Sequence, residues 1–304
     1  MGKEFDEIHY WSEIKLDIVK DYASAYSKIL SAQTKPPLYH LYIDAFAGSG
    51  LHISKSSGSF VTGSPLNALL VEPPFREYHF IDLNSGKADT LRTLTSGRKD
   101  VTVHEGDCNT LLTHGVFPQA SYKAYRRALC LLDPYGLHLD WSVIFAAGQM
   151  KSIEIFLNFP VADMNRNVLW HCPERVDVRQ ASRMNAFWGD DSWRKAAYDT
   201  SQNLFGWEQK TDNDAIVAAF QKRLKTVAGF KYVPDPIPMR NSRNAVVYYL
   251  FFASQKPAAA QIVQQIFDKY RNKGAPENGN EVKHRVDRVQ LESTDGLHQG
   301  ELGL

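Results

Sequence analysis

Four aspartates stand at or just after the ends of four short apolar segments of this 304-residue sequence. Asp44 follows "LYI", Asp82 follows "YHFI", Asp107 comes shortly after "VTVHE", and Asp133 follows "ALCLL". Carboxylates accept hydrogen bonds from amines and hydroxyls, so acids at these points are suited to a ligand that carries both groups. The last three are separated by 25 and 26 residues, the length of one strand plus one helix, which predicts that they lie along one edge of a sheet.

The residues that begin with Asp44 form the pattern D-x-F-x-G-x-G. Glycine permits positive φ and has no Cβ to keep a ligand away from the backbone. A nicotinamide dinucleotide fingerprint, G-x-G-x-x-G, requires another small residue three positions after Gly50, where this chain has Ile53. An acid ahead of the glycines suits a ligand with a cationic amine. The pattern therefore favours S-adenosylmethionine, with Asp82 accepting from its ribose hydroxyls and Asp107 from its adenine amino group.

The stretch "LLDPYG" delivers Asp133, Pro134 and Tyr135 as the fourth apolar segment ends. A carboxylate oxygen and the carbonyl of the following proline can together accept both hydrogens of an amino group, and the aromatic ring can stack on a planar base. Amino methyltransferases that act on adenine or cytosine use such an arrangement in a D-P-P-Y motif. Here the second proline is missing and the tyrosine stands one position earlier. A β-turn with Asp and Pro in favoured positions is the alternative interpretation.

The rest of the chain supplies the elements that would position these residues. Short apolar runs alternate with helical stretches, which indicates parallel strands joined by crossovers and covered on both faces. We expect strands at 41–46, 78–82, 101–105, 128–132 and 153–159, and helices at 13–30, 65–71, 87–95, 111–117 and 141–147. Two later strands, in "FKYVPDPIPMRN" and "AVVYYLFFAS", are expected to pair at the sheet edge. The predicted fold class is α/β, a doubly wound Rossmann-like sheet, mostly parallel with an antiparallel edge pair.

A single methyltransferase-like domain is expected over residues 1–271, with an inserted helical region at about 161–225 and a polar, flexible tail at 272–304. The first helix carries one apolar stripe at spacings of three and four residues. Its members are Ile14, Ile18, Tyr22, Tyr26 and Ile29. The second helix begins late and leaves a Ser/Gly-rich loop at 51–63, which either covers the ligand or is a disordered insertion.

The composition is that of an ordinary globular protein, with 43% hydrophobic and 23% charged residues. A net charge of +1 means that attraction to a polyanion must come from a local patch. The three cysteines lack metal or redox spacing and the histidines are scattered, so no metal site is predicted. The N-terminus lacks the apolar core of a signal peptide, and the apolar run at 245–253 is too short for a membrane helix. We therefore expect a cytoplasmic location and no membrane partner.

Together these motifs resemble the class I S-adenosylmethionine-dependent methyltransferases, and more narrowly the three-Cys-motif partner protein (TcmP) family. The narrower resemblance rests on "YIDAFAGSG", "GSPLNAL", "FIDLN", "LLDPYG", "NFPVADMNRN" and "FWGDDSWR". The cofactor-binding residues that it implies are Asp44, Phe46, Ala47, Gly48, Gly50, Asp82, Leu83, Asp107 and Cys108. It also implies that the catalytic residues Asp133, Pro134 and Tyr135 face the methyl acceptor, and that a three-Cys-motif protein of radical-enzyme type is a candidate partner.

Four further residues are predicted to bind the substrate: Asn158, Arg166, Arg240 and Arg243. Arg166 follows the fifth strand and can hold a phosphate. The two later arginines belong to a basic stretch, 222–243, which carries six positive charges and one negative charge, a local balance of +5. Such a stretch suits a nucleic-acid backbone, although a solvated helix face followed by a loop has the same composition.

The sequence therefore predicts a methyltransferase that uses S-adenosylmethionine to methylate a nitrogen, on a nucleobase in DNA or RNA. A second hypothesis is a cofactor-binding subunit with little activity of its own, which acts with the cysteine-motif protein. The missing proline in "DPYG" keeps that hypothesis open. A nicotinamide-dependent oxidoreductase is disfavoured by Ile53 and by the acid ahead of the glycines.

Overall fold

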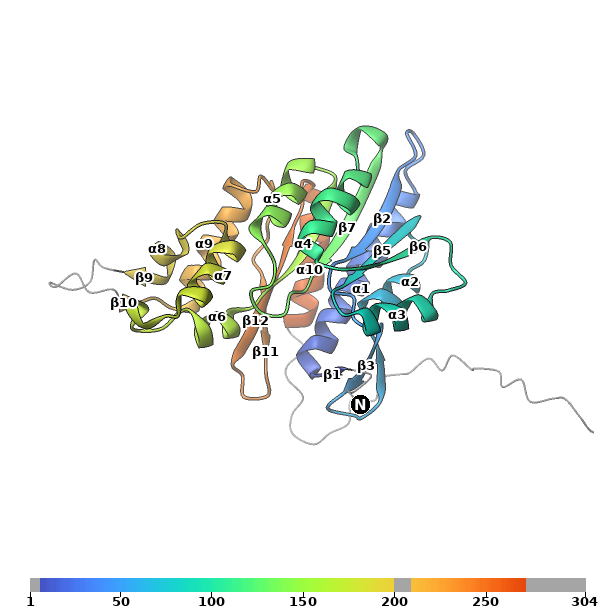
Figure 1. Ribbon diagram of the computed structural model, residues 1–304. Helices are drawn as coiled ribbons and strands as arrows, with labels where there is room; N and C mark the ends of the chain where they lie inside the picture. Colours follow the sequence, from blue (N-terminus) through green and yellow to red (C-terminus); the bar gives the residue numbers. More distant parts are fainter. Residues whose placement is uncertain (1–5, 200–208, 272–304) are drawn as a thin grey trace, which may run out of the picture.

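The computed structural model describes residues 6–199 and 209–271. Within these residues the largest sheet has seven strands in the order β11-β12-β8-β7-β2-β5-β6 (Figure 1). Its strands are β2 (Tyr39–Asp44), β5 (Glu77–Asp82), β6 (Val101–Glu105), β7 (Arg126–Leu132), β8 (Ile153–Phe159), β11 (Ile237–Arg240) and β12 (Val246–Ala253). The five strands from β6 to β8 are parallel, whereas β12 is antiparallel to both β8 and β11. The α/β class and the antiparallel pair at the sheet edge are as predicted.

Helices pack on both faces of this sheet. One face is covered by α1 (Tyr10–Ser31), α2 (Ser64–Leu69), α3 (Ser85–Leu94) and α10 (Pro257–Arg271). The other face is covered by α4 (Cys108–Leu111), by the helical turns Leu112–Val116 and Phe117–Gln119 that continue it, and by α5 (Trp141–Met150). The side chains of β2 alternate between the two faces of the sheet. Leu41 and Ile43 join the core beside α5, while Tyr42 joins the core beside α1.

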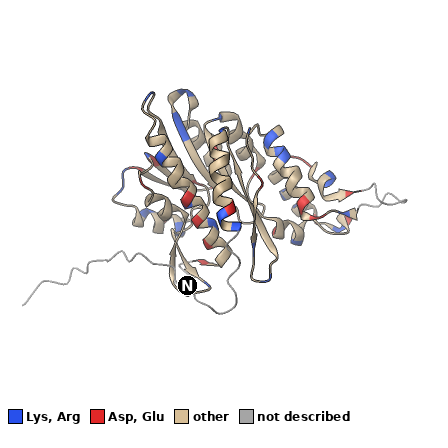
Figure 2. Ribbon diagram, turned by 180° about the vertical axis from the view of Figure 1, so that it is seen from behind, with Lys and Arg blue, Asp and Glu red and all other residues tan. Residues whose placement is uncertain are grey.

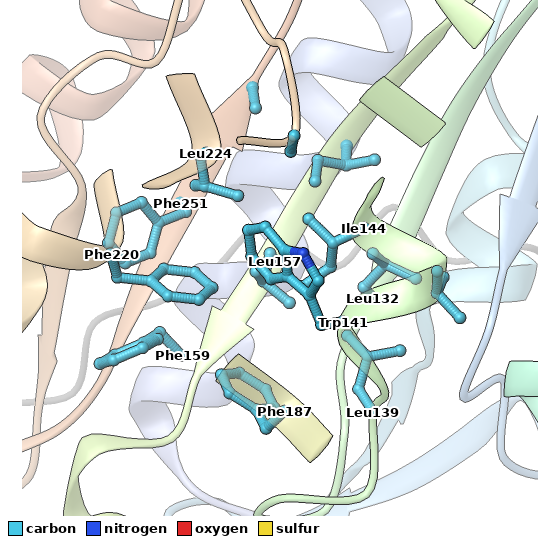
Figure 3. Packing of buried hydrophobic residues seen from close by; sticks show 14 of the residues in the cluster. Leu132, Leu139, Trp141, Ile144, Leu157, Phe159, Phe187, Phe220, Leu224 and Phe251 are labelled. Carbon is cyan, nitrogen blue, oxygen red and sulfur yellow. The ribbon is translucent and has the colours of Figure 1, made fainter. Parts of the chain in front are cut away.

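The segment between β8 and β11 is mostly helical. It contains α6 (Val161–Asn167), α7 (Val178–Trp188), α8 (Trp193–Ala197) and α9 (Asn213–Thr226), with the short strands β9 (Tyr198–Asp199) and β10 (Gln209–Lys210). Two further short helical turns span Tyr122–Ala124 before β7 and Pro173–Arg175 before α7. This part shares its core with the sheet. Figure 3 shows Trp141 of α5 near Phe220 of α9 and Phe159 of β8, and the Trp141 and Phe220 ring centroids are 5.9 Å apart. Burial of each such ring stabilises the packing by about 1.5–3 kcal/mol.

A small second sheet lies at the carboxyl ends of the central strands. It consists of β1 (Asp6–Ile8), β3 (Leu51–Ser54) and β4 (Phe60–Thr62), in which β1 is parallel to β3 and β3 is antiparallel to β4. Figure 1 places it on the same side of the molecule as the β11–β12 hairpin. The prediction of a loop at 51–63 is wrong, because most of this segment forms a hairpin that the N-terminal strand extends. We call β1, β3 and β4 the cap sheet.

Two other expectations concern the ends of the chain. In α1 the predicted stripe is confirmed for Ile18, Tyr22 and Tyr26, but Ile29 is 52% exposed and does not belong to the buried face. Lys15 lies on that face instead. The tail predicted at 272–304 lies outside the described residues. None of the helices in the described part of the chain is both long enough and apolar enough to cross a membrane.

Candidate functional site

The order of the strands reverses beside β2. The chain passes from β2 to β5 and β6 on one side and then returns to β7 on the other side. Ligands of open α/β sheets bind outside the carboxyl ends of the strands at such a reversal. Asp44 is the last residue of β2 and Asp133 immediately follows β7, so these two acids flank the reversal. Asp82 ends β5, and Asp107 lies two residues beyond β6.

Asp44 is fully buried. Its Oδ1 accepts a hydrogen bond from the Phe46 N–H at 3.2 Å. Its Oδ2 is shielded from solvent and has no partner of acceptable hydrogen-bond geometry among the described residues. Burial raises the pKa of this carboxyl from 3.8 to about 7, although the nearby Ser64 hydroxyl and the Phe46 N–H oppose the rise. A buried acid with one open oxygen is suited to a ligand that brings a proton donor or a positive charge.

The turn after β2 brings its backbone close to Asp82. Gly48 and Gly50 have φ values of +64° and +86°, in the left-handed region that glycine tolerates. A Cβ on Gly50 would lie 3.0 Å from Leu91 Cδ1, so a larger residue would also crowd α3. The Gly48 N–H donates to Asp82 Oδ2 at 2.8 Å, and Asn84 N–H donates to Asp82 Oδ1 at 2.8 Å. Asp82 therefore fixes the turn and keeps further lone pairs for a ligand.

The other predicted cofactor-binding residues differ in their exposure. Phe46 is half-buried and Ala47 is buried, whereas the Leu83 side chain is 76% exposed next to Asp82. Asp107 is the N-cap of α4 and accepts from the N–H groups of the next helical turn. Cys108 is buried, and burial raises the pKa of its thiol to about 12, so it is not an activated nucleophile.

Asp133 is held by two donors. Its Oδ2 forms an ion pair with the Lys15 ammonium group of α1, and its Oδ1 accepts from Asn158 Nδ2 at 2.8 Å. The Asp133 side chain remains 26% exposed. The Tyr135 ring is 68% exposed, and its hydroxyl donates to Asp6 Oδ2 of the cap sheet at 3.4 Å. The cap sheet thus contacts the residues that follow β7.

The loop after Asp133 is anchored at both ends. Gly136 has a φ of +56°, and a Cβ at this position would lie 2.6 Å from Asp163 Oδ2 of α6. Leu137 and Leu139 are buried in the core beside α5. The close approach to α6 and the buried leucines therefore fix the direction in which "DPYG" leaves the sheet. Pro134 is buried, and the role of its carbonyl as an acceptor stays a prediction.

Two residues at this edge were not predicted from the sequence. Lys15 lies three residues before Ile18 on the buried face of α1, so the helical periodicity places this charged residue among the apolar ones. His52 of β3 is half-buried beside the glycine turn, and its Nδ1 has no hydrogen-bond partner in the described part of the chain. Burial lowers the pKa of its imidazole. No such periodicity marks His52 in the sequence, because it lies inside a polar segment.

The predicted substrate-binding residues lie around the same edge. Asn158, in β8, is close to Asp133 and is 8% exposed. Arg166 is exposed on α6, which begins two residues after β8. Since β12 is antiparallel to β8, the turn between β11 and β12 lies beyond the carboxyl end of β8. Arg240 and Arg243 belong to this turn region, and both are exposed.

The expectation of one basic patch at 222–243 is wrong for Arg223. Its side chain is only 12% exposed, pairs with Asp190 at 2.7 Å and lies 4.7 Å from the centroid of the Trp141 ring. The remaining positive residues are divided between α9, the loop after it and the β11–β12 hairpin. Figure 2 shows the positions of Lys and Arg interspersed with those of Asp and Glu along the ribbon. Only the hairpin arginines lie at the edge that carries the aspartates.

In the described residues, no three His, Cys, Asp or Glu side chains are grouped so that they could hold a metal ion. This edge of the sheet brings together carboxylates, a glycine turn and backbone N–H groups. It can hold an amine near Asp44 and hydroxyls near Asp82. A second amine can approach the exposed part of Asp133.

No family model matches this chain, and no curated protein matches it. Among solved structures, protein LPL1258 from Legionella pneumophila str. Philadelphia 1, of the family model DUF519, aligns with a TM-score of 0.50 and 13% identity over 86% of this chain and 94% of its own. The DszA carbon methyltransferase aligns with a TM-score of 0.40 and 13% identity over 77% of this chain and 52% of its own. The citrinin polyketide synthase CMeT domain aligns with a TM-score of 0.37 and 13% identity over 72% of this chain and 47% of its own.

This chain thus spans about half of each of those two methyltransferase structures. The likeness to LPL1258 shows a shared fold and no more, because the identity is low. The narrower resemblance to the TcmP family stays a prediction, since no family model matches. The comparisons therefore identify this chain as one of the proteins with a mixed α/β fold built on a large central sheet.

Proposed function

We propose that this protein is an S-adenosylmethionine-dependent methyltransferase that methylates a nitrogen of a nucleobase. The observation that carries the proposal is Asp44, a buried carboxylate with one open oxygen, beside a glycine turn at the reversal of strand order. The Phe46 N–H and the nearby Ser64 hydroxyl account for part of its surroundings, but Oδ2 has no partner of acceptable hydrogen-bond geometry, and a buried carboxyl without a full set of partners costs free energy. A ligand with a cationic amine would supply the missing partner.

The chain fits S-adenosylmethionine at several points along the sheet edge. The unpaired Asp44 oxygen, which is shielded from solvent in the ligand-free protein, suits the ammonium group of the methionine part, and the turn at Gly48 and Gly50 presents backbone without Cβ atoms. Asp82 retains lone pairs for ribose hydroxyls while it fixes the turn. The exposed Leu83 side chain offers an apolar surface for the adenine, with Asp107 one strand further along.

The residues after β7 would hold the methyl acceptor. Asp133 and the Pro134 carbonyl accept the hydrogens of an amino group, and Tyr135 supplies an exposed ring for stacking. When bound, S-adenosylmethionine supplies a sulfonium methyl group, so that the acceptor nitrogen forms the N–C bond, the electron pair of the C–S bond returns to sulfur, and one proton leaves the nitrogen for water. The contribution of the protein is then chiefly placement of the acceptor in line with that bond.

The hairpin arginines support a polyanionic substrate. Arg240 and Arg243 are exposed in the turn region beyond the carboxyl end of β8, and Arg166 is exposed on the helix that follows β8. Positive groups that surround an acceptor site can bind backbone phosphates and so position a base. The proposed substrate is therefore DNA or RNA rather than a free small molecule.

The test combines binding and transfer. Calorimetry with S-adenosylmethionine and with NAD⁺ should show binding of the first alone, and the binding should be much weaker in Asp44→Asn. Asp89→Asn, an exposed carboxylate on α3, serves as the matched control and should bind normally. Incubation with methyl-labelled S-adenosylmethionine and separate DNA, tRNA and rRNA fractions should then label one of them. Binding of NAD⁺ instead would refute the proposal.

The same experiment distinguishes the alternative function. A subunit that binds the cofactor but acts only with a three-Cys-motif protein would bind S-adenosylmethionine and label none of the three fractions. The ion pair of Asp133 with Lys15 is the observation that favours this alternative, because it partly neutralises the acid of the acceptor motif. Label that appears in any nucleic-acid fraction would exclude this alternative.

A further inference from the structure

Lys15 is a lysine on the apolar face of a helix. Its side chain is 8% exposed, and its neighbours on the buried face of α1 include Leu16, Ile18 and Val19. A buried ammonium group is costly unless it is paired. Its partner is the Asp133 carboxylate, 118 residues away, at the end of β7. The N-terminal helix therefore delivers a positive charge directly to the proposed acceptor site.

The Asp133 carboxylate is held from two sides. Lys15 binds Oδ2, and Asn158 Nδ2 donates to Oδ1 at 2.8 Å. An ionised carboxylate only accepts hydrogen bonds, so the Asn158 amide must present its nitrogen to Asp133. Each carboxylate oxygen has a second lone pair, and 26% of the Asp133 side chain is still exposed. The two partners thus fix the orientation of Asp133 without removing its capacity to accept.

We propose that Lys15 and Asn158 are positioning residues that hold Asp133 for a neutral amino group. This inference rests on the proposed function. It also reassigns Asn158, which the sequence suggested as a substrate contact. Because the Lys15 charge balances that of Asp133, the site offers no net attraction to a cation, and the Lys15 ammonium would repel a protonated lysine side chain. The acceptor class is therefore a neutral exocyclic amine of a nucleobase rather than an amine of a protein.

The pair is first tested in the cofactor-free protein. Lys15→Met should lower the Tm, because it leaves Asp133 partly buried without its cation. Lys28→Met, at an exposed position of the same helix, is the matched control and should leave the Tm unchanged. In the double variant Lys15→Met with Asp133→Asn, the Tm should recover above that of Lys15→Met alone. Strictly additive losses would overturn the pairing, whatever the cofactor proves to be.

Transfer is then measured with labelled S-adenosylmethionine and the nucleic-acid fraction that the wild-type protein labels. Lys15→Met should lower kcat about a hundredfold because the acceptor is misplaced. The S-adenosylmethionine Kd should change far less, through the smaller effect of the Lys15 charge, which lowers the pKa of Asp44. Lys15→Arg keeps the charge and should recover part of the loss. If Lys15→Met does not fold, Asn158→Leu replaces it and should show a loss confined to kcat, and Lys15→Arg should show a smaller loss that is also confined to kcat.

Three results would contradict the inference. They are full transfer by Lys15→Met, a cofactor Kd weakened in parallel with kcat, and methylation of a lysine-rich protein in preference to nucleic acid. Failure of the wild-type protein to bind S-adenosylmethionine would refute the proposed function instead. In that case the Tm comparison still decides whether Lys15 and Asp133 act as a pair.

Discussion

The binding of S-adenosylmethionine should depend on pH through Asp44. Burial raises the pKa of this carboxyl from 3.8 to about 7, so the free protein is largely protonated there in mildly acidic solution. The ammonium group of the ligand requires the ionised form, because only that form provides a charge-assisted acceptor. Lowering the pH therefore makes the ligand displace a proton before it can bind, and affinity falls.

The magnitude follows from the pKa. At pH 5 about one protein in a hundred has Asp44 ionised, so the Kd should be about a hundredfold weaker than its best value, and at pH 6 about tenfold weaker. Binding should release about 0.9 proton at pH 6, whereas at pH 8 it should take up about half a proton, because most of the free ligand then lacks its ammonium proton. Above pH 8 the ligand loses its own ammonium proton, at a pKa of about 7.8, so affinity falls again. The pH of tightest binding should lie between the pKa of Asp44, about 7, and the pKa of the ligand ammonium group, about 7.8.

Isothermal titration in buffers of different ionisation enthalpy measures both quantities, since the proton count follows from the dependence of the observed heat on the buffer. Asp44→Asn should bind weakly at every pH and release no proton in acid. The same carboxyl also affects stability. Its folded-state pKa lies above the unfolded value, so the free energy of unfolding should fall as pH rises between about 4 and 7, and Asp44→Asn should remove this fall. A Kd independent of pH from 5 to 7 would refute the account of Asp44.

Three further predictions concern the turn, the core and the hairpin. Gly50→Ala should lower the free energy of unfolding by about 1–3 kcal/mol, because its φ is +86° and the new Cβ would be crowded. Chemical denaturation measures this change, and an unchanged midpoint would argue against the strained turn. Tyr22→Phe should cost about 1–3 kcal/mol, since its hydroxyl donates to the half-buried Glu154 carboxylate at 2.5 Å. The same denaturation assay would disprove this if Tyr22→Phe matched the wild type. Replacing both Arg240 and Arg243 by Ala should weaken nucleic-acid binding and reduce the slope of log K against log salt concentration by about 2. An unaltered slope in a filter-binding titration would show that the hairpin does not contact the nucleic acid.

Much of the central sheet could be predicted because its strands are apolar on both faces. The segments predicted at 101–105 and 153–159 match β6 and β8 residue for residue. Most of β8 is apolar and buried on both faces, whereas β6, at the sheet edge, alternates two valines with polar residues and is only partly buried. The aspartates at the strand ends could be placed on one edge for the same reason, as parallel strands end together. The strand order itself has no local signal, because it depends on which crossovers pack.

What could not be predicted depends on contacts between distant segments. β1 has only three residues and becomes a strand by pairing with β3, so no periodicity marks it. Counting charges along 222–243 included Arg223, whose guanidinium is held by Asp190 and two tryptophan rings. Lys15 was passed over because the apolar stripe of α1 was traced through hydrophobic residues alone, although its spacing places it on the same face.

The most direct test of the central claim is a crystal structure of the protein with S-adenosylhomocysteine. We predict that the amino group of the ligand lies against Asp44, its ribose hydroxyls against Asp82, and its adenine beside Leu83 and Asp107. Density for the ligand on another surface of the protein, or along this edge with its amino group away from Asp44, would contradict it.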